Sequence, residues 1–399
     1  MYFLTDIEHI RHVLVDNVDN YKKYFEGLKP IFGKAMITID GSLWQKIRKP
    51  QQPFFHPSVY EEYFPHLMTA VKSTAEDWSD LAVRGSEVEI LEQTWSLAAD
   101  MACRALFDRE MPFNPHAVFG AVKAYTDVAN HKTIRAKKMS GAVSEVGEDE
   151  DAAQAIAAWL SLPDAVTGAT PLGGREKTLL KMLELAEADT AVPEFDHQQV
   201  LDEIKQYLWA GTETTALTLG WIFYLLSLHP EVAEKIRREG EDVYGDREPD
   251  WEDIQKLTYT RAVMLETLRL YPPAWALMRT ADVEDEIGGY KIEPGDKIVL
   301  SPYMVHHNPK YWDDPEKFDP ARFLPGAIKK RVKYSYLPFG AGKRFCLGGQ
   351  LSQLETVLAL TMLLRRFRLE YAGDGPAKFG ASVMLTPKGG LPFKLHALS

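Results

Sequence analysis

One of the chain's two cysteines, Cys346, lies in a loop rich in glycine and basic residues, YLPFGAGKRFCLGGQ at residues 336–350. Because glycine lacks a side chain and tolerates positive φ, this backbone can turn tightly and approach something flat. The charges of Lys343 and Arg344, and the N-terminus of a helix predicted to follow, favour the thiolate form of Cys346. A thiolate in such a loop is a candidate metal ligand. The nearby glycines are Gly340, Gly342 and Gly348.

Residue types and spacing alone leave other interpretations of Cys346 open. Most free cysteines are buried and inert. A tetrahedral zinc site needs a second cysteine or a close histidine pair, and Cys103 lies on a distant predicted helix. A nucleophilic cysteine needs a histidine base, and no local feature nominates one. Metal ligation is therefore one hypothesis among several.

A second stretch that could do chemistry, AGTETT at residues 210–215, lies inside a long predicted helix. Its alanine, glycine and threonines make one helix face small and hydroxylated where it would otherwise be bulky. Glu213 adds a carboxyl group to this apolar surrounding. The alternative to a chemical role is a polar helix segment tolerated by a water pocket.

The elements that position these residues are predicted to be mostly helices. The long helix runs from an Asp196 cap to Pro230, roughly 50 Å at 1.5 Å per residue. Residues 59–107 show helical spacing of apolar side chains, and a short strand followed by a helix capped by Asp6 opens the chain. A further helix, residues 349–367, follows the cysteine loop.

Short strands are predicted after residues 271–273 (YPP), because the stretch 286–303 alternates around GG and PG turns, and the chain ends in two more strands. Residues 140–175 are rich in Gly, Pro, Ser and acids, which predicts flexible connections around a short helix at 152–160. The predicted fold class is mainly α with a smaller β portion. No linker or internal repeat divides the chain, so a single domain over residues 1–399 is expected.

The composition excludes several classes of protein. Lys and Arg total 46 against 57 Asp and Glu, a net charge of −11, so no global nucleic-acid-binding surface is expected. Two cysteines make no disulfide framework and no signal peptide is recognisable, which favours the cytoplasm. Residues 207–228 are long enough to span a bilayer, but Glu213 there would cost roughly 2.5–3.5 kcal/mol. A buried helix is expected instead of a membrane span.

The cysteine loop resembles the haem-binding loop of the cytochrome P450 family, the haem-thiolate monooxygenases. Phe339, Gly342, Cys346 and Gly348 fall in the family pattern F-x-x-G-x-x-x-C-x-G. The resemblance implies the cytochrome P450 fold, with haem b (iron protoporphyrin IX) between the long central helix and this loop. It makes Cys346 the proximal iron ligand, whose electron donation favours O–O cleavage, and places Phe339, Gly340 and Gly348 beside the cofactor.

Further motifs match the family in order. ETLR, Glu266–Arg269, resembles E-x-x-R, and DPARF supplies Arg322, so the resemblance implies a buried Glu–Arg–Arg set beneath the haem. Standing alone, Glu266 and Arg269 would be an ordinary surface i,i+3 ion pair.

WQKIR, at residues 44–48, resembles W-x-x-x-R and implies that Trp44 and Arg48 bind a haem propionate. Arg279 and Arg344 occupy the other usual propionate positions, where guanidinium groups suit carboxylates. Each arginine alone would be a solvated surface residue.

AGTETT resembles the family's (A/G)-G-x-(D/E)-T-(T/S). The resemblance implies that Ala210 contacts the haem, that Thr214 donates a hydrogen bond during oxygen activation, and that Glu213 relays protons as a general acid. The implied reaction inserts one oxygen atom from O₂ into a hydrophobic small molecule.

Electrons are expected from a ferredoxin or flavodoxin with an NAD(P)H-dependent reductase, because the sequence contains no flavin or iron–sulfur domain. Residues 327–345 hold six basic residues and no acid, and we expect them to dock such an acidic partner unless they are simply a solvated face. The six are Lys329, Lys330, Arg331, Lys333, Lys343 and Arg344.

The resemblance also implies an apolar substrate pocket, and an adjustable lid formed by residues 113–175. The residues expected to line the pocket are Met36, Ile37, Ala274, Trp275, Leu277, Met278, Val383 and Met384.

A monomer is expected. Relatives usually carry several dozen more residues before the tryptophan-to-arginine helix than residues 1–43 supply, and His307 stands where an arginine is common.

Two rival functions remain. A haem-thiolate peroxygenase or a peroxide-rearranging enzyme would need no external electrons, but such relatives often lack the acid–threonine pair present here as Glu213 and Thr214. A haem-binding sensor or carrier would show no turnover, and the same pair argues against it.

Overall fold

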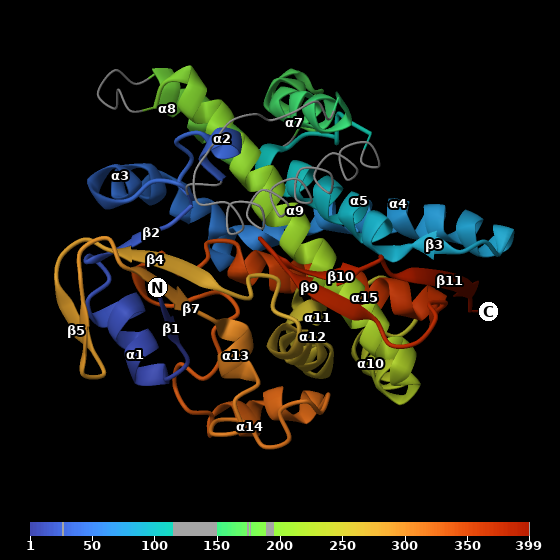
Figure 1. The fold of residues 1–399 in the computed structure, drawn as a ribbon. Coiled ribbons are helices and arrows are strands. Elements are labelled where there is room, and N and C mark those ends of the chain that lie inside the picture. Colours follow the sequence, from blue (N-terminus) through green and yellow to red (C-terminus); the bar gives the residue numbers. More distant parts are fainter. Residues whose placement is uncertain (26–27, 115–149, 174, 176, 189–194, 399) are drawn as a thin grey trace.

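The computed structural model describes residues 1–25, 28–114, 150–173, 175, 177–188 and 195–398. Helices dominate it and surround the 32-residue helix α9, His197–Leu228, which crosses the molecule diagonally in Figure 1. Before α9 come α1 (Ile7–Arg11), α2 (Lys29–Phe32), α3 (Gly41–Gln51), α4 (Tyr60–Arg84), α5 (Ile90–Ala102), α7 (Glu150–Gly168) and α8 (Leu179–Ala188). After it come α10 (Pro230–Tyr244), α11 (Trp251–Lys256), α12 (Thr258–Leu270), α13 (Pro302–His306), α14 (Pro325–Ile328) and α15 (Gly349–Arg366).

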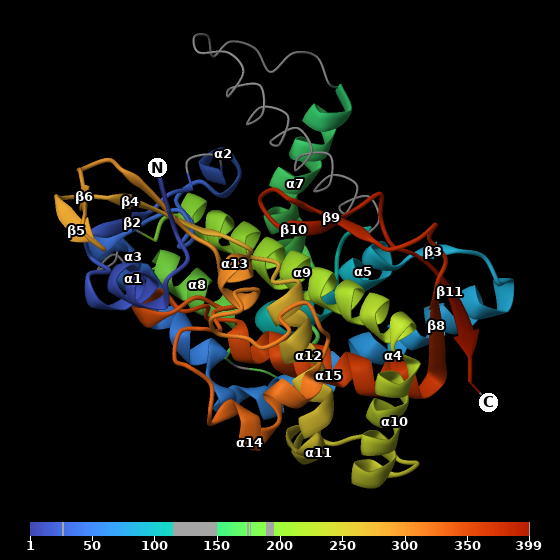
Figure 2. The same cartoon turned by 60° about the horizontal axis from the view of Figure 1, so that its bottom comes forward.

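The strands form small sheets beside the helices. The largest has the order β1-β7-β4-β2, from Tyr2–Leu4, Lys297–Leu300, Leu277–Ala281 and Tyr21–Lys23. A second, β3-β11-β8, joins Val88–Glu89, Pro392–Ala397 and Phe367–Tyr371. Two hairpins complete the set, β5 (Asp285–Ile287) with β6 (Tyr290–Ile292), and β9 (Lys378–Ala381) with β10 (Leu385–Lys388). In Figures 1 and 2 the largest sheet lies near the N-terminus and β3-β11-β8 near the C-terminus, so helices fill the space between.

Close packing against α5 fixes the position of α9. A Cβ added to Gly220 of α9 would lie 2.5 Å from Leu91, and one added to Gly211 would lie 3.6 Å from Ala102. Leu91 lies near the start of α5 and Ala102 at its end, so the two helices run antiparallel. A side chain at position 220 would therefore require Leu91 to move.

The predicted fold class is confirmed, and most predicted elements occur. Asp6 caps α1, and the Asp196 side chain accepts a hydrogen bond from the Gln199 N–H at the start of α9. No single helix of the described residues passes a length and apolarity test for a membrane span; α9 passes only together with α10, from which it is bent by 111°.

Two expectations about residues 113–175 turn out differently. The short helix predicted at 152–160 is the first part of the 19-residue α7, because the spacing of buried Trp159, Leu162 and Val166 continues the helix past Pro163. The expected lid falls mostly on residues 115–149, which lie outside the described part of the chain.

Candidate functional site

The cysteine loop needs glycine at two positions. Gly340 has a φ of +73° and Gly342 a φ of +67°, both in the left-handed region. A Cβ at Gly342 would also lie 2.2 Å from the backbone oxygen of Leu14, so any side chain there would collide with the π-helix His12–Asp16. The turn closes with a hydrogen bond from the Cys346 N–H to the Phe339 carbonyl, 3.0 Å long. Gly348 is the N-cap of α15, which begins at Gly349 as predicted.

The Cys346 side chain is both accessible and close to other protein groups. Burial among protein atoms raises its pKa, while the backbone N–H groups of Gly348 and Gly349 and the Arg48 guanidinium lower it. Both observations hold if the sulfur borders an internal space. Within the described residues, no group of three or more His, Cys, Asp and Glu could hold a metal ion.

The expected source of positive charge at Cys346 needs correction. The Lys343 ammonium forms an ion pair with Asp19, and Arg344 pairs with Asp40 at 2.5 Å between Nη2 and Oδ1. The cation that lowers the pKa of Cys346 is Arg48, 298 residues away in the sequence. Proximity in the sequence therefore did not identify the cation that acts on Cys346, because the side chains of Lys343 and Arg344 pair with the carboxylates of Asp19 and Asp40 instead.

The middle of α9 is less completely buried than the rest of this part of the helix. Side chains from Asp202 to Leu226 are buried except at residues 209–211, 213 and 214, which are partly accessible. Burial raises the pKa of Tyr207, and the charges of Glu203 and Cys346 raise it further while Arg48 lowers it. Tyr207, which lies one turn before Gly211, is thus close enough to Cys346 to respond to its charge.

The predicted acid and hydroxyl of α9 have different partners. The Thr214 hydroxyl donates to the Ala210 carbonyl at 2.7 Å, within the helix. The Glu213 carboxylate accepts a hydrogen bond from Nε1 of Trp95, on α5, at 3.1 Å. Burial raises the pKa of Glu213 to about 7, and the Trp95 N–H lowers it in part. A carboxyl with that pKa can both release and accept protons near neutral pH.

The four side chains predicted to bind propionates gather around α3 and β4. The Arg48 guanidinium lies 5.1 Å from the Trp44 ring centroid and donates to the Phe345 carbonyl at 2.7 Å. Arg344 donates to the Tyr21 carbonyl. Arg279 lies in β4, opposite Lys23 of β2 in the strand register.

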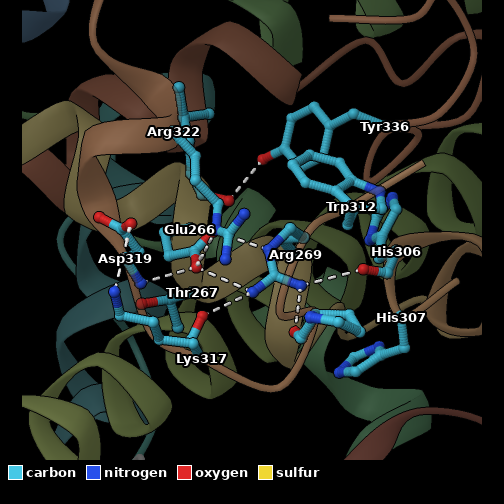
Figure 3. A network of polar contacts seen from close by, with 12 residues as sticks. Glu266, Thr267, Arg269, His306, His307, Trp312, Lys317, Asp319, Arg322 and Tyr336 are labelled. Carbon is cyan, nitrogen blue, oxygen red and sulfur yellow. Dashed lines mark hydrogen bonds and ion pairs between the residues drawn. The ribbon is translucent and has the colours of Figure 1, made fainter. Parts of the chain in front are cut away.

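The predicted Glu266–Arg269 pair forms a fully buried network (Figure 3). Nε and Nη2 of Arg269 donate to the two carboxylate oxygens of Glu266 at 2.7 and 2.8 Å. The other Arg269 N–H groups donate to the carbonyls of His306, Pro315 and Lys317. All five donors of this guanidinium are therefore satisfied.

The third member of the set is less tightly held. Nε of Arg322 lies 3.6 Å from Glu266 Oε1, and it makes no hydrogen bond with a described residue. Oε1 instead accepts a hydrogen bond from the Asp319 N–H at 2.9 Å. Burial raises the pKa of Glu266, and the Arg269 guanidinium lowers it.

Comparison with known proteins gives the family. The profile described as "Cytochrome P450" matches residues 1–393. The protein LUTEIN DEFICIENT 5, chloroplastic, from Arabidopsis thaliana is 30% identical, with 96% of this chain and 68% of that protein covered. The chain belongs to the cytochrome P450 family. It is therefore a cytochrome P450 enzyme, an oxidoreductase, and the predicted family is confirmed.

Other relatives of this cytochrome P450 agree. Cyclooctat-9-en-7-ol 5-monooxygenase from Streptomyces melanosporofaciens is 30% identical, with 92% of this chain and 80% of that protein covered. The crystal structure of a cytochrome P450, CYP102L1, superposes with a TM-score of 0.85 at 23% identity, covering all of this chain and 92% of that one. The last comparison concerns the fold alone.

The cytochrome P450 family implies a haem cofactor, and the residues around α3 and β4 fit one. Lys23, Arg48, Arg279 and Arg344 gather there, with Asp40 the carboxylate that pairs among them. Nε of each of the three arginines makes no hydrogen bond with a described residue. Burial, with a smaller contribution from the neighbouring arginines, lowers the pKa of Arg279 to about 10 and that of Lys23 to about 7, although the Asp40 carboxylate opposes both shifts. Such an excess of buried positive charge suits a ligand carrying carboxylates.

The predicted pocket segments of this P450 come together in part. Trp275 Nε1 donates to the Ser382 carbonyl at 2.8 Å, which joins residues 274–278 to the turn containing Val383 and Met384. Leu277 lies beside Gly340, where an added Cβ would be 3.7 Å from its Cδ1.

Met36 and Ile37 lie against α9. Their backbone N–H groups donate to the side chains of Glu203, at 2.7 Å, and Gln206. The Lys23 ammonium also donates to the Met36 carbonyl at 2.6 Å. This segment is thus placed between β2 and the N-terminal half of α9.

The basic loop of this P450 is smaller than predicted. Arg331 stacks on Phe323 at 4.0 Å and donates to the Arg322 carbonyl, and Arg344 is turned inward. Lys329, Lys330 and Lys333 are exposed, and so are Ile328 and Val332 between them.

Sequence reasoning missed three side chains of the site: Lys23, Asp40 and Trp95. Asp40 directly precedes α3 and could have been noticed as an acid next to the W-x-x-x-R motif. Lys23 and Trp95 reach the site only through strand pairing and helix packing, so no local signal marks them.

Proposed function

We propose that this cytochrome P450 inserts one oxygen atom from O₂ into a hydrophobic small molecule, using electrons from a separate redox partner. The observation that supports this most is that Glu213 and Thr214 are partly accessible within the largely buried middle of α9, and that burial raises the pKa of Glu213 to about 7. An acid and a hydroxyl at that place can supply protons while O₂ is reduced. A haem-binding carrier or sensor would not need this supply of protons.

Each group of the site has a defined task in this proposal. Cys346 binds the iron of haem b, and Arg48, Arg279, Arg344, Trp44 and Lys23 hold its propionates. Bound haem supplies the iron at which O₂ is reduced and from which one oxygen atom reaches the substrate. The Thr214 hydroxyl turns from the Ala210 carbonyl toward the pocket, and Glu213 releases a proton and regains one from water. Over one cycle, two electrons and two protons convert the second oxygen atom to water.

The substrate class follows from the pocket wall. Met36, Ile37, Trp275, Met278 and Val383 are apolar, so burying an apolar molecule against them is favourable. The related monooxygenase named above acts on cyclooctat-9-en-7-ol by its name, and we infer a hydrophobic substrate here as well.

The electrons come, in this proposal, from an acidic ferredoxin or flavodoxin that docks on Lys329, Lys330 and Lys333. Three exposed cations flanked by exposed Ile328 and Val332 suit such a partner, because charge steers the encounter and apolar contact holds it. Changing Lys330 and Lys333 to Glu should slow haem reduction and reduce its dependence on salt. An unchanged rate and salt dependence would rule out this docking surface.

We further propose that residues 1–399 form one domain acting as a cytoplasmic monomer.

The proposed reaction is tested by turnover with ¹⁸O₂. Purified protein is supplied with ferredoxin, ferredoxin reductase and NAD(P)H, using a substrate found by a binding screen. Product containing one labelled oxygen atom, formed only with NAD(P)H, supports the proposal. Equal turnover with hydrogen peroxide alone would show a peroxygenase, and no NAD(P)H-dependent product would contradict an oxygenase.

A further inference from the structure

Two adjacent residues of α5 attach to α9 at its chemically active stretch. The Thr94 hydroxyl donates to the Ala216 carbonyl at 3.0 Å, and the Trp95 indole N–H donates to Glu213 Oε2 at 3.1 Å. The close contacts of Gly220 with Leu91 and of Gly211 with Ala102 lie on either side. The register of the two helices is therefore fixed over the whole stretch that carries Glu213.

Trp95 differs from other buried tryptophans because its indole N–H donates a hydrogen bond to a side chain. Trp78, Trp159 and Trp221 are also buried, and their Nε1 atoms have no hydrogen-bond partner in the described part of the chain. A buried indole thus does not need a partner to fit this core, and its N–H can only donate. Trp95, only 2% exposed, directs that donor at a carboxylate.

Little else among the described residues acts on this carboxyl group. Burial raises the pKa of Glu213 and the Trp95 N–H lowers it, and no charged side chain of the packed elements contributes. Asp100 and Arg104, on the α5 side, pair with each other at 2.8 Å, and Glu355 on α15 accepts from Thr215. Burial and one hydrogen bond therefore control both the direction and the proton affinity of Glu213.

We propose that Trp95 is a positioning residue for proton delivery: its N–H holds the Glu213 carboxylate toward α5 and sets how readily that group takes up and releases a proton. The inference rests on the proposed role of Glu213 in oxygen reduction. Because the N–H donates to the ionised form, the hydrogen bond is strongest when Glu213 has given up its proton, and it weakens when the proton returns. Trp95 thereby limits how long Glu213 stays protonated near neutral pH.

The test uses Trp95→Phe, which keeps an aromatic ring and removes the donor, in the haem-loaded protein. Trp78→Phe is the matched control, since it also truncates a buried indole but removes no hydrogen bond. The carbonyl infrared band of protonated Glu213, identified by its absence in Glu213→Gln, is titrated with pH. We expect the midpoint to rise by about one pH unit, a tenfold change in proton affinity, in Trp95→Phe and to stay in place in Trp78→Phe. An unmoved midpoint in Trp95→Phe, or an equal shift in the control, would overturn the inference.

A second readout is the hydrogen peroxide released per NAD(P)H consumed, measured against pH with ferredoxin and ferredoxin reductase and no added substrate. In Trp95→Phe, we expect the pH dependence of this ratio to shift to higher pH. A profile altered by Glu213→Gln but not by Trp95→Phe would overturn this inference alone. If Glu213→Gln has no effect either, the proposed function of Glu213 fails as well. Should Trp95→Phe not fold, benzothienylalanine at position 95, which has the shape of tryptophan without the N–H, replaces it.

Discussion

Two glutamates of this cytochrome P450 whose pKa is raised by burial have contrasting partners. Glu266, on α12, accepts two hydrogen bonds from Arg269 and one from the Asp319 N–H, with Arg322 also in ion-pair range. Glu213, on α9, accepts one hydrogen bond, from Trp95, and no described cation contributes to its pKa. Glu266 is completely inaccessible, whereas Glu213 is partly accessible.

The difference separates a structural carboxylate from one suited to chemistry. A carboxylate held by several donors has little freedom to move or to accept a proton, so we expect the Glu266 network to have a structural role. A carboxyl group with one weak donor and a pKa of about 7 can change its charge during a reaction. Burial alone therefore does not distinguish a structural carboxylate from a reactive one. The number and charge of the groups that bind the carboxylate do distinguish them.

Arg269→Ala should produce the largest loss of stability. It leaves Glu266 buried without its cation, which costs roughly 3–5 kcal/mol in the free energy of unfolding. Urea unfolding followed by circular dichroism measures this change. Arg322→Ala is the control, and we expect about 1 kcal/mol, because its Nε lies 3.6 Å from Glu266 without a hydrogen bond. Equal losses in the two variants would contradict the distinction between them.

Glu213→Gln should instead affect catalysis. Product formation per NAD(P)H should fall roughly 100-fold, since an amide cannot relay a proton. Its free energy of unfolding should stay within about 1 kcal/mol of the wild type, because the amide is neutral and still accepts from Trp95. Glu266→Gln should show the reverse, a clear loss of stability. Turnover assays and urea unfolding of both variants provide the measurement, and a parallel response in both would break the comparison.

The pH dependence of stability should reveal the weakly satisfied carboxyls. Burial raises the pKa of Glu213 to about 7 and that of Glu355 to about 8, above the value in an unfolded chain. The folded protein thus retains these protons at pH values where the unfolded chain has lost them. Stability from this source is present at low pH and declines as pH rises toward 7 and then 8, by up to about 1.4 kcal/mol per pH unit and group.

Glu355→Gln should therefore flatten the upper part of this decline. Urea unfolding of the wild type and of Glu355→Gln, from about pH 5 to about pH 8, measures the slope. A slope that is identical in both proteins would show that Glu355 is not protonated in the folded state.

The smallest expected effect extends the comparison to cations. All donors of Arg269 are satisfied, whereas among the described residues only Arg344 of the four cations around α3 and β4 forms an ion pair with a carboxylate, that of Asp40. Lys23→Met should speed haem loss to apomyoglobin roughly tenfold, because the proposed contact of Lys23 with a propionate would disappear. Lys22→Met, the exposed neighbour that pairs with Asp282 at 3.5 Å, is the control. Equal haem loss in both variants would remove Lys23 from the cofactor site.

Much of the fold could be predicted from local patterns. Helix periodicity and the Asp6 and Asp196 caps gave α1, α4, α5 and α9, because these signals depend on neighbours in the sequence. The glycines of the cysteine loop were informative for the same reason, since the backbone conformation itself requires them. The extent of α7 was not predictable from composition, because tertiary burial of Leu162 and Val166 outweighs the local Pro and Gly signals.

The partners of the site residues depend on tertiary contacts. That Glu266 and Arg269 would pair follows from their i,i+3 spacing, but the carbonyls that complete the network come from residues 306–317. Trp95 meets Glu213 across a sequence separation of 118 residues, through a helix contact that Gly220 permits. Such contacts leave no periodic trace in the sequence.

The absorption spectrum of the reduced, carbon-monoxide-bound protein tests the central claim that Cys346 binds the haem iron. We expect purified wild type to contain haem and to show the red-shifted Soret band of thiolate ligation. Cys103→Ala should keep this band, because Cys103 is buried in the helical core. Cys346→Ala should lose it. Wild-type protein without haem, or a thiolate band that persists in Cys346→Ala, would contradict the claim.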